Sequence, residues 1–220
     1  DKYFTLEELK EAIKENQTDK DGKLVVLYAG NKEAQHSYIE IAKDKGYQVL
    51  LLDSPIIPHL IQKLESDNSG LTFVRVDSDH IDNLIKKEET AISKLSTEEQ
   101  ESLKTVVETI VPKQTYTVQL EALDSSAAPF IITQPEFMRR MKEMSQTGGG
   151  GMFGMGNFPE MYNLVVNTNS DLATSILNNE DKTVQENLVK QALDLAKLSQ
   201  NLLKGEALTA FVKRSFEMIK

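Results

Sequence analysis

The stretch Leu24-Val-Val-Leu-Tyr28 is an unbroken apolar run. Such a short run without alternation is typical of a strand that is covered on both faces, as in the parallel sheets of α/β proteins. Two further runs, Gln48-Val-Leu-Leu-Leu52 and Leu71-Thr-Phe-Val-Arg-Val76, have the same character. Helical patterns separate the three runs, so we predict a small parallel sheet joined by right-handed crossovers.

Three helices are predicted around these strands. Thr5-Leu-Glu-Glu8 is a capping box, and it opens an apolar pattern that recurs at helical spacing: Leu6, Leu9 and Ile13. Asn31 can cap a second helix that Gly46 would end. Ser54-Pro55 opens a third helix, whose apolar face comprises Ile57, Leu60, Ile61 and Leu64. Residues 1–77 are therefore predicted to form a three-layer α/β unit.

Residues 78–95 lose the apolar period and are predicted to be a linker or a poorly packed helix. A second domain is predicted over 96–220. It opens with the capping box Ser96-Thr-Glu-Glu99, and three strand-like segments follow at 116–120, 130–133 and 162–166. This order predicts an α+β domain with an antiparallel or mixed sheet.

The C-terminal region has the pattern of two amphipathic helices. Such a hairpin can fold back within one chain, or pair with its copy in a second chain as a four-helix bundle. We favour dimerisation, through Leu188, Leu195, Leu198, Leu202, Leu208, Phe211, Val212, Phe216 and Ile219.

Six of the seven methionines lie between Met138 and Met161. Methionine side chains are unbranched and polarizable, so a methionine-rich surface adapts to apolar partners of different shape. A helix over 137–144 would place one apolar stripe opposite its charged residues, and a glycine-rich loop would carry further apolar side chains. A core helix followed by a flexible connector remains an alternative. The candidate binding residues are Phe137, Met138, Met141 and Met144 on the helix, and Met152, Phe153 and Met155 on the loop.

Composition excludes several functions. The net charge of −9 argues against general nucleic-acid binding, and the absence of cysteine excludes disulfides and thiolate catalysis and fits a cytoplasmic location. No apolar run is long enough to cross a membrane, and we expect no signal peptide, because the charged start Asp1-Lys2-Tyr3 lacks the basic-then-apolar pattern. The chain also lacks an initiating methionine, so we expect it to be a piece of a longer protein.

No catalytic or metal site is predicted. Asp77-Ser-Asp79-His80 has ligand-type side chains but is better interpreted as a polar turn. Gly149-Gly-Gly151-Met-Phe-Gly154 satisfies the dinucleotide-binding pattern, yet a helix precedes it where a strand is required.

The order of these features resembles the C-terminal half of the heat-shock protein 90 chaperones, in the bacterial HtpG-type form. Tyr3-Phe-Thr-Leu-Glu-Glu-Leu-Lys, Gly46-Tyr-Gln-Val-Leu-Leu-Leu-Asp53 and Phe73-Val-Arg-Val-Asp77 are similar to the small α/β subdomain that closes the family's middle domain. The family's dimerisation domain is similar to three later segments: Asn163-Leu-Val-Val-Asn-Thr-Asn-Ser170, Gln191-Ala-Leu-Asp-Leu-Ala-Lys-Leu198 and Gly205-Glu-Ala-Leu-Thr-Ala-Phe-Val-Lys-Arg214.

The resemblance implies a homodimer that is joined through the last two helices, with the methionine-rich region contacting unfolded or partly folded client proteins. It also implies that the ATP and Mg²⁺ sites of an ATP-driven parent lie outside this chain, which would then bind no cofactor and catalyse nothing. Two rivals remain. One is a small-molecule or nucleotide-binding α/β domain with its ligand near Gly30 and Asp53, and the other is a passive scaffold.

Overall fold

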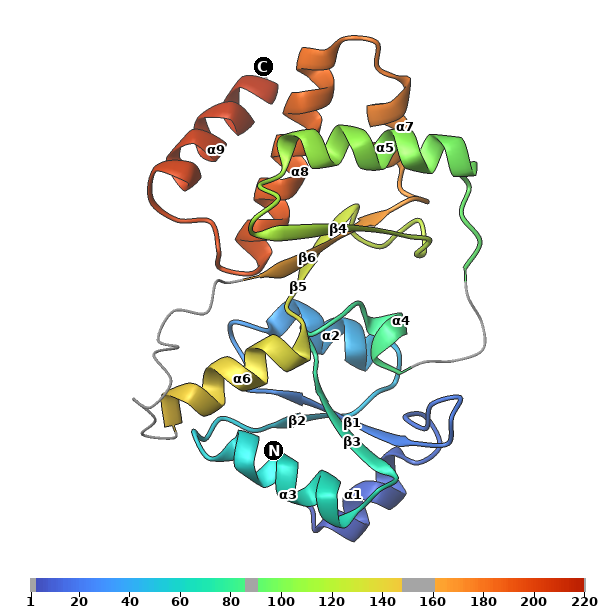
Figure 1. Cartoon of the computed structure of the whole chain (residues 1–220), viewed down its shortest axis with the longest axis vertical. Helices are drawn as coiled ribbons and strands as arrows, with labels where there is room; N and C mark the ends of the chain where they lie inside the picture. The colour runs from blue at the N-terminus through green and yellow to red at the C-terminus, as the bar shows by residue number, and fades with distance from the viewer. Residues whose placement is uncertain (1–2, 86–90, 148–160, 220) are drawn as a thin grey trace. The chain divides into compact units, whose positions relative to one another are not determined.

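The computed structural model describes residues 3–85, 91–147 and 161–219, and Figure 1 labels their helices and strands. The described residues form two compact units. The first contains those of Asp1–Glu89 and Gln134–Pro159, and the second those of Thr90–Thr133 and Glu160–Lys220. Each unit therefore combines segments that are distant in sequence. The domain boundaries at residues 77 and 96 stay a prediction.

The sheet of the first unit has the predicted parallel topology. Its strands are β1 (Leu24–Ala29), β2 (Val49–Leu51) and β3 (Leu71–Arg75), in the order β2-β1-β3. Leu27 is in register with Val49 on one side and with Val74 on the other. The apolar run at 24–28 thus forms the central strand.

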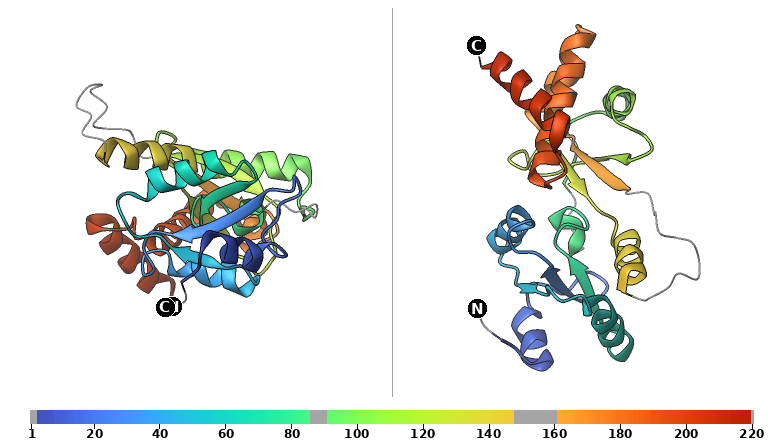
Figure 2. Two further views of the ribbon diagram at one scale, coloured as in Figure 1. Left: turned by 90° about the horizontal axis from the view of Figure 1, so that it is seen from below. Right: turned by 90° about the vertical axis from the view of Figure 1, so that its left-hand side faces the viewer.

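Helices cover both faces of this sheet, which confirms the three layers (Figures 1 and 2). α1 (Leu6–Ile13) and α3 (Ile57–Asp67) pack on the face to which Val26, Tyr28 and Phe73 point. α2 (His36–Asp44) and the short α4 (Ile81–Leu84) lie on the other face and contact each other. α2 ends as predicted, because Gly46 adopts a φ of 77°, which a glycine tolerates without strain.

β2 differs from its prediction as a buried strand. It pairs with β1 alone and forms an edge of the sheet, so the Leu51 side chain is 53% exposed. Leu60, which the spacing placed on the apolar face of α3, is also exposed. A three-stranded sheet has a single central strand, and of its two edge strands β3 is covered at Leu71 and Phe73 while β2 is not covered at Leu51.

The stretch 78–95 contains α4 as well as the chain that enters the second unit. Ile81, Leu84 and Ile85 are buried there, so part of this polar stretch contributes to the core of the first unit.

The second unit has a mixed sheet, as predicted. Its strands β4 (Tyr116–Glu121), β6 (Tyr162–Asn167) and β5 (Phe130–Thr133) lie in that order, with β4 parallel and β5 antiparallel to β6. α5 (Thr97–Ile110), α7 (Asp171–Asn178) and α8 (Lys182–Ser199) pack together, and α9 (Gly205–Met218) follows.

The core of this unit is formed by the sheet with α5, α7 and α8. Leu103, Val107, Leu164, Ile176 and Val189 are its most deeply buried side chains. α7 is not part of the sequence prediction, although Ser170 caps it by accepting a hydrogen bond from the Ala173 amide. Within the described parts of the chain, no helix is both long and apolar enough to span a membrane.

Candidate client-contact surface and neighbouring sites

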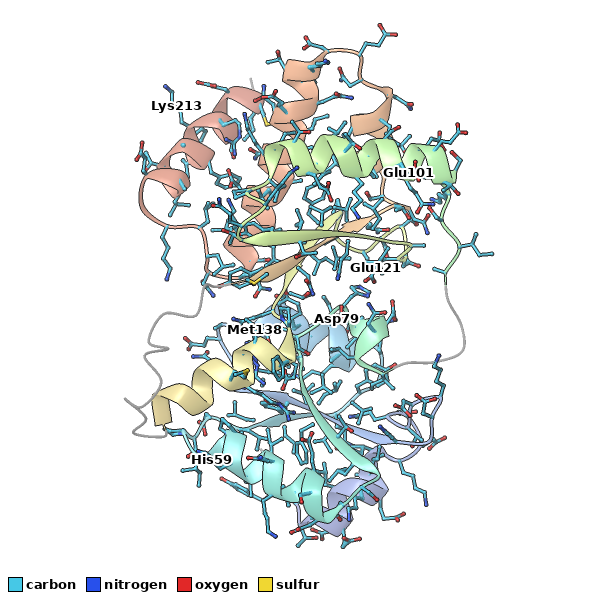
Figure 3. All side chains as sticks on the ribbon, in the orientation of Figure 1. His59, Asp79, Glu101, Glu121, Met138 and Lys213 are labelled. Atoms are coloured by element: carbon cyan, nitrogen blue, oxygen red, sulfur yellow. The ribbon has the colours of Figure 1, made fainter. Side chains whose placement is uncertain are left out.

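The methionine-rich helix α6 (Glu136–Thr147), which carries the labelled Met138 in Figure 3, belongs to the first unit. Phe137 is 69% exposed and Met141 is 37% exposed, whereas Arg139 is 3% exposed. Met138 is partly buried. An ordinary amphipathic helix buries its apolar stripe, whereas over residues 136–141 of α6 the apolar Phe137 and Met141 are exposed and Arg139 is buried.

The charged side of α6 is held by a half-buried ion cluster. Arg140 makes a bidentate pair with Glu65 on α3, at 2.9 Å from Nη1 to Oε2 and 3.3 Å from Nη2 to Oε1. Its Nε donates to Glu136 at 2.7 Å. Burial alone would lower the pKa of Arg140, but the hydrogen bonds to Glu65 and Glu136 outweigh it and raise the pKa above its ordinary value. Arg140 is therefore a permanent cation at this position.

The same cluster covers the free edge of β3. Glu65 Oε1 accepts a hydrogen bond from the Phe73 amide at 2.7 Å, and Arg140 Nη2 donates to the Phe73 carbonyl. Both backbone groups point away from the sheet and would otherwise be unpaired, because β3 is an edge strand. One ion pair thus completes the sheet edge and attaches α6 to it.

Arg139 reaches the end of β1. Its guanidinium lies 5.6 Å from the centre of the Tyr28 ring and donates to the Tyr28 hydroxyl and to Glu136. Burial and the Glu136 carboxylate raise the pKa of Tyr28 to about 12, so the phenol stays protonated near neutral pH. Just before α6, the backbone N–H of Gln134 donates to the backbone carbonyl of Asp77 at 3.2 Å, which strengthens the attachment of α6.

Four other candidate binding residues are not placed. Met144 lies in the part of α6 whose side chains are not described, and Met152, Phe153 and Met155 lie outside the described residues.

The candidate dimerisation residues divide into buried and exposed groups. On α9, Phe211 is 8% exposed and packs toward α8, whereas Phe216 is 65% exposed. On α8, the buried stripe is Val189, Ala192, Leu193 and Ala196. The apolar side chains that remain exposed on these helices include Leu195, Leu198, Val212, Phe216 and Ile219, while Leu188, Leu202 and Leu208 are half-buried.

Polar contacts hold α9 against α8 beside Phe211. Arg214 donates to Asp194 at 2.6 Å and to Gln191 at 2.8 Å, and Gln191 donates to Ser215 at 2.9 Å. The hairpin therefore closes within one chain while leaving part of its apolar surface open.

A cavity of about 460 Å³ lies at the carboxyl ends of the parallel strands of the first unit, lined among others by Gly30, Asp53, Arg75 and Arg139. This is where ligands bind in many open α/β sheets. However, the amides of Gly30 and Asn31, which could hold an anion, already donate to Gln35 Oε1 at 2.8 and 3.0 Å. The strand-to-helix turn is thus closed by its own glutamine.

A buried polar cluster follows β6. Asn167 Oδ1 accepts from the amides of Leu123 and Asn169 at 3.2 and 3.0 Å, and its Nδ2 donates to the Asp124 carbonyl at 2.8 Å. Asn169 accepts from the Lys94 amide at 2.7 Å. These asparagines fix the segment after β4 and the chain that enters the second unit.

His80 is the buried histidine of the predicted polar turn. Its Nδ1 accepts a hydrogen bond from the Asp82 amide and caps α4. Burial lowers the pKa of His80, although the nearby negative charge of Asp82 acts to raise it. Within residues 3–85, 91–147 and 161–219, no group of three or more histidine, aspartate or glutamate side chains is placed to hold a metal ion.

No protein-family model matches the chain. The chaperone protein HtpG of Bacteroides thetaiotaomicron is 36% identical over an alignment of 285 residues, covering 99% of this chain and 42% of that protein. The chaperone protein HtpG of Porphyromonas gingivalis is 41% identical over 198 residues, covering 89% of this chain and 29% of that protein. The chain belongs to the HtpG-type chaperones of the heat-shock protein 90 family.

The chain spans less than half the length of these HtpG relatives and matches their C-terminal part. The predicted family is therefore confirmed. The residues that attach α6 in this HtpG-type chain were not predicted from the sequence, because Tyr28 and Glu65 lie far from α6 along the chain. The spacing of Glu136, Arg139 and Arg140 is the one local signal, since residues three and four apart meet on a helix.

Proposed function

We propose that this chain provides client contact and homodimerisation for an ATP-dependent chaperone, with the ATP site and its Mg²⁺ outside the chain and the whole protein in the cytoplasm. The observation that carries the proposal is the outward-facing apolar side of α6, on which Phe137 and Met141 are exposed. Apolar side chains on a helix that is anchored by its charged side remain available to a partner.

Client contact is tested by binding of the purified chain to a permanently unfolded, fluorescently labelled protein. Burying one large apolar side chain contributes about 1.5–3 kcal/mol, so Phe137→Ser with Met141→Ser is expected to weaken binding by at least about tenfold. Ile92→Ser is the matched control, because Ile92 is an exposed apolar residue of the second unit. Equal affinity of the double variant and the control would contradict the proposal.

Dimerisation is supported by the exposed apolar side chains of α8 and α9. Phe216→Asp is a sharper test than Phe211→Asp, because Phe211 is buried within the chain and its loss would also disturb α9. We expect sedimentation to show a dimer for the native chain and a monomer for Phe216→Asp. An unchanged dimer would remove Phe216 from the interface.

A small-molecule site is the second candidate, and the cavity at the strand ends favours it. Because Gln35 occupies the amides of Gly30 and Asn31, a phosphate would have to displace its side chain. Calorimetric titration with ATP and NAD decides between the candidates. Heat of binding that is lost in Arg139→Gln would favour the cavity over the chaperone fragment.

A further inference from the structure

We infer that Glu65 and Arg140 are positioning residues, which together form a salt-sensitive latch that holds the apolar side of α6 toward clients. The inference rests on the proposed function of α6. Neither residue belongs to the exposed apolar surface, so both would act on client binding through the placement of the helix.

Over the described side chains of α6, residues 136–141, the contacts to the rest of the first unit are mainly charged. Among these side chains only Arg139 is buried, Met138 is partly buried, and none of the six belongs to the apolar core between the sheet, α1 and α3. Most helices in proteins are stabilised by packing an apolar face. α6 instead relies on Arg139 and Arg140 with their partners Tyr28, Glu136 and Glu65.

Glu65 lies on α3 and joins this helix to α6 through its ion pair with Arg140. Its side chain, like that of Arg140, is 24% exposed, so the pair is shielded from water more than a surface ion pair. Glu136 lies on α6 itself, so its ion pairs with Arg139 and Arg140 remain even when α6 is not docked on α3. Loss of the Glu65 charge therefore weakens docking without removing the ion pairs within α6.

Glu65→Gln removes the charge of the latch while leaving the edge of the sheet intact. Glu65→Gln keeps an amide oxygen that can accept from the Phe73 amide, so the edge of β3 stays paired while the charge is lost. Lys63→Gln is the matched control, because it breaks an exposed ion pair, with Asp67, on the same helix. Exposed pairs contribute little to stability.

The experiment is hydrogen exchange of the α6 amides in the full chain, combined with binding to the labelled unfolded protein. Hydrogen bonds to charged groups are worth more than neutral ones, so we expect Glu65→Gln to speed α6 exchange about tenfold or more. Exchange of the β1 amides should be unchanged. Lys63→Gln should leave α6 exchange at the native rate.

The dependence of α6 exchange on ionic strength distinguishes an ion-pair latch from an uncharged structural contact. Raising ionic strength from about 0.05 to 0.5 M shortens the screening length, so α6 exchange in the native chain should accelerate. The acceleration should be smaller in Glu65→Gln, which has already lost the pair.

Client affinity completes the test. Weaker binding by Glu65→Gln together with faster α6 exchange supports the latch. Unchanged α6 exchange, or faster exchange with unaltered client affinity, overturns it. If Phe137→Ser with Met141→Ser binds client normally, the proposed function fails instead, and α6 exchange then decides whether Glu65 holds the helix.

Discussion

Asn167→Ala should strongly destabilise the second unit, because the Asn167 side chain is fully buried and makes three hydrogen bonds to backbone groups. The substitution removes the acceptor of the Leu123 and Asn169 amides, which are both buried. An orphaned buried donor costs about 1–3 kcal/mol, and the lost bond to the Asp124 carbonyl costs about 1 kcal/mol. Two orphaned donors and one lost bond together give an expected loss of about 3–7 kcal/mol.

Native-state hydrogen exchange of the β6 amides measures this loss directly. Each 1.36 kcal/mol is a factor of ten, so exchange should be faster by roughly a hundredfold to a hundred-thousandfold. Asn163→Ala is the matched control: Asn163 lies on the same strand, is half-buried and makes no side-chain hydrogen bond among the described residues. If Asn167→Ala accelerates exchange less than tenfold, or no more than the control, the buried amides do not depend on Asn167.

Two further predictions concern pH and the terminal hairpin. The pKa of His80 is lowered in the folded chain from its ordinary value of 6.5. As pH drops from 7 to 5, the unfolded chain therefore binds more protons at His80 than the folded chain does, and the free energy of unfolding should fall. His80→Asn keeps a capping acceptor and should flatten this pH dependence in urea unfolding; an unchanged slope would exclude His80 as its source. Phe211→Ala should cost α9 about 3–5 kcal/mol of protection from exchange, because Phe211 is its buried side chain, whereas Phe216→Ala should leave protection in the monomer within about 0.5 kcal/mol. Equal effects would contradict the assignment of Phe211 to the fold.

The elements that the sequence predicted well are those that depend on local interactions. Both capping boxes form as expected, with Thr5 paired to Glu8 and Ser96 paired to Glu99. The apolar run at 24–28 forms a strand as predicted, and the fold places it at the centre of the sheet, flanked on both edges. The run at 48–52 is equally apolar, yet it forms an edge strand. Local composition does not determine which of several apolar runs takes the central place.

The candidate site was predicted in part. The spacing of Phe137, Met138 and Met141 correctly indicated a helix with an apolar side, but it could not say whether that side is buried or exposed. The answer depends on Tyr28 and Glu65, which reach α6 only through the fold. Gln35 is a similar case, because it reaches the amides of Gly30 and Asn31 through the turn that precedes α2.

On the proposal that α6 contacts clients, its attachment by charged residues would keep the apolar Phe137 and Met141 exposed instead of packed onto its own domain. An apolar helix attached by its apolar side would have to detach before it met a client, and detachment would lose the burial that held it. Attachment by the charged side avoids this conflict, because Arg139 and Arg140 are satisfied by Tyr28, Glu136 and Glu65 while Phe137 and Met141 stay free to bind. The arrangement also makes docking adjustable, since an ion pair that is 24% exposed on each side responds to ionic strength and to neighbouring charge, whereas an apolar contact does not. On the proposal above, Phe137 and Met141 would contact the client while Arg139 and Arg140 place the helix, so client affinity would respond to a change at either group.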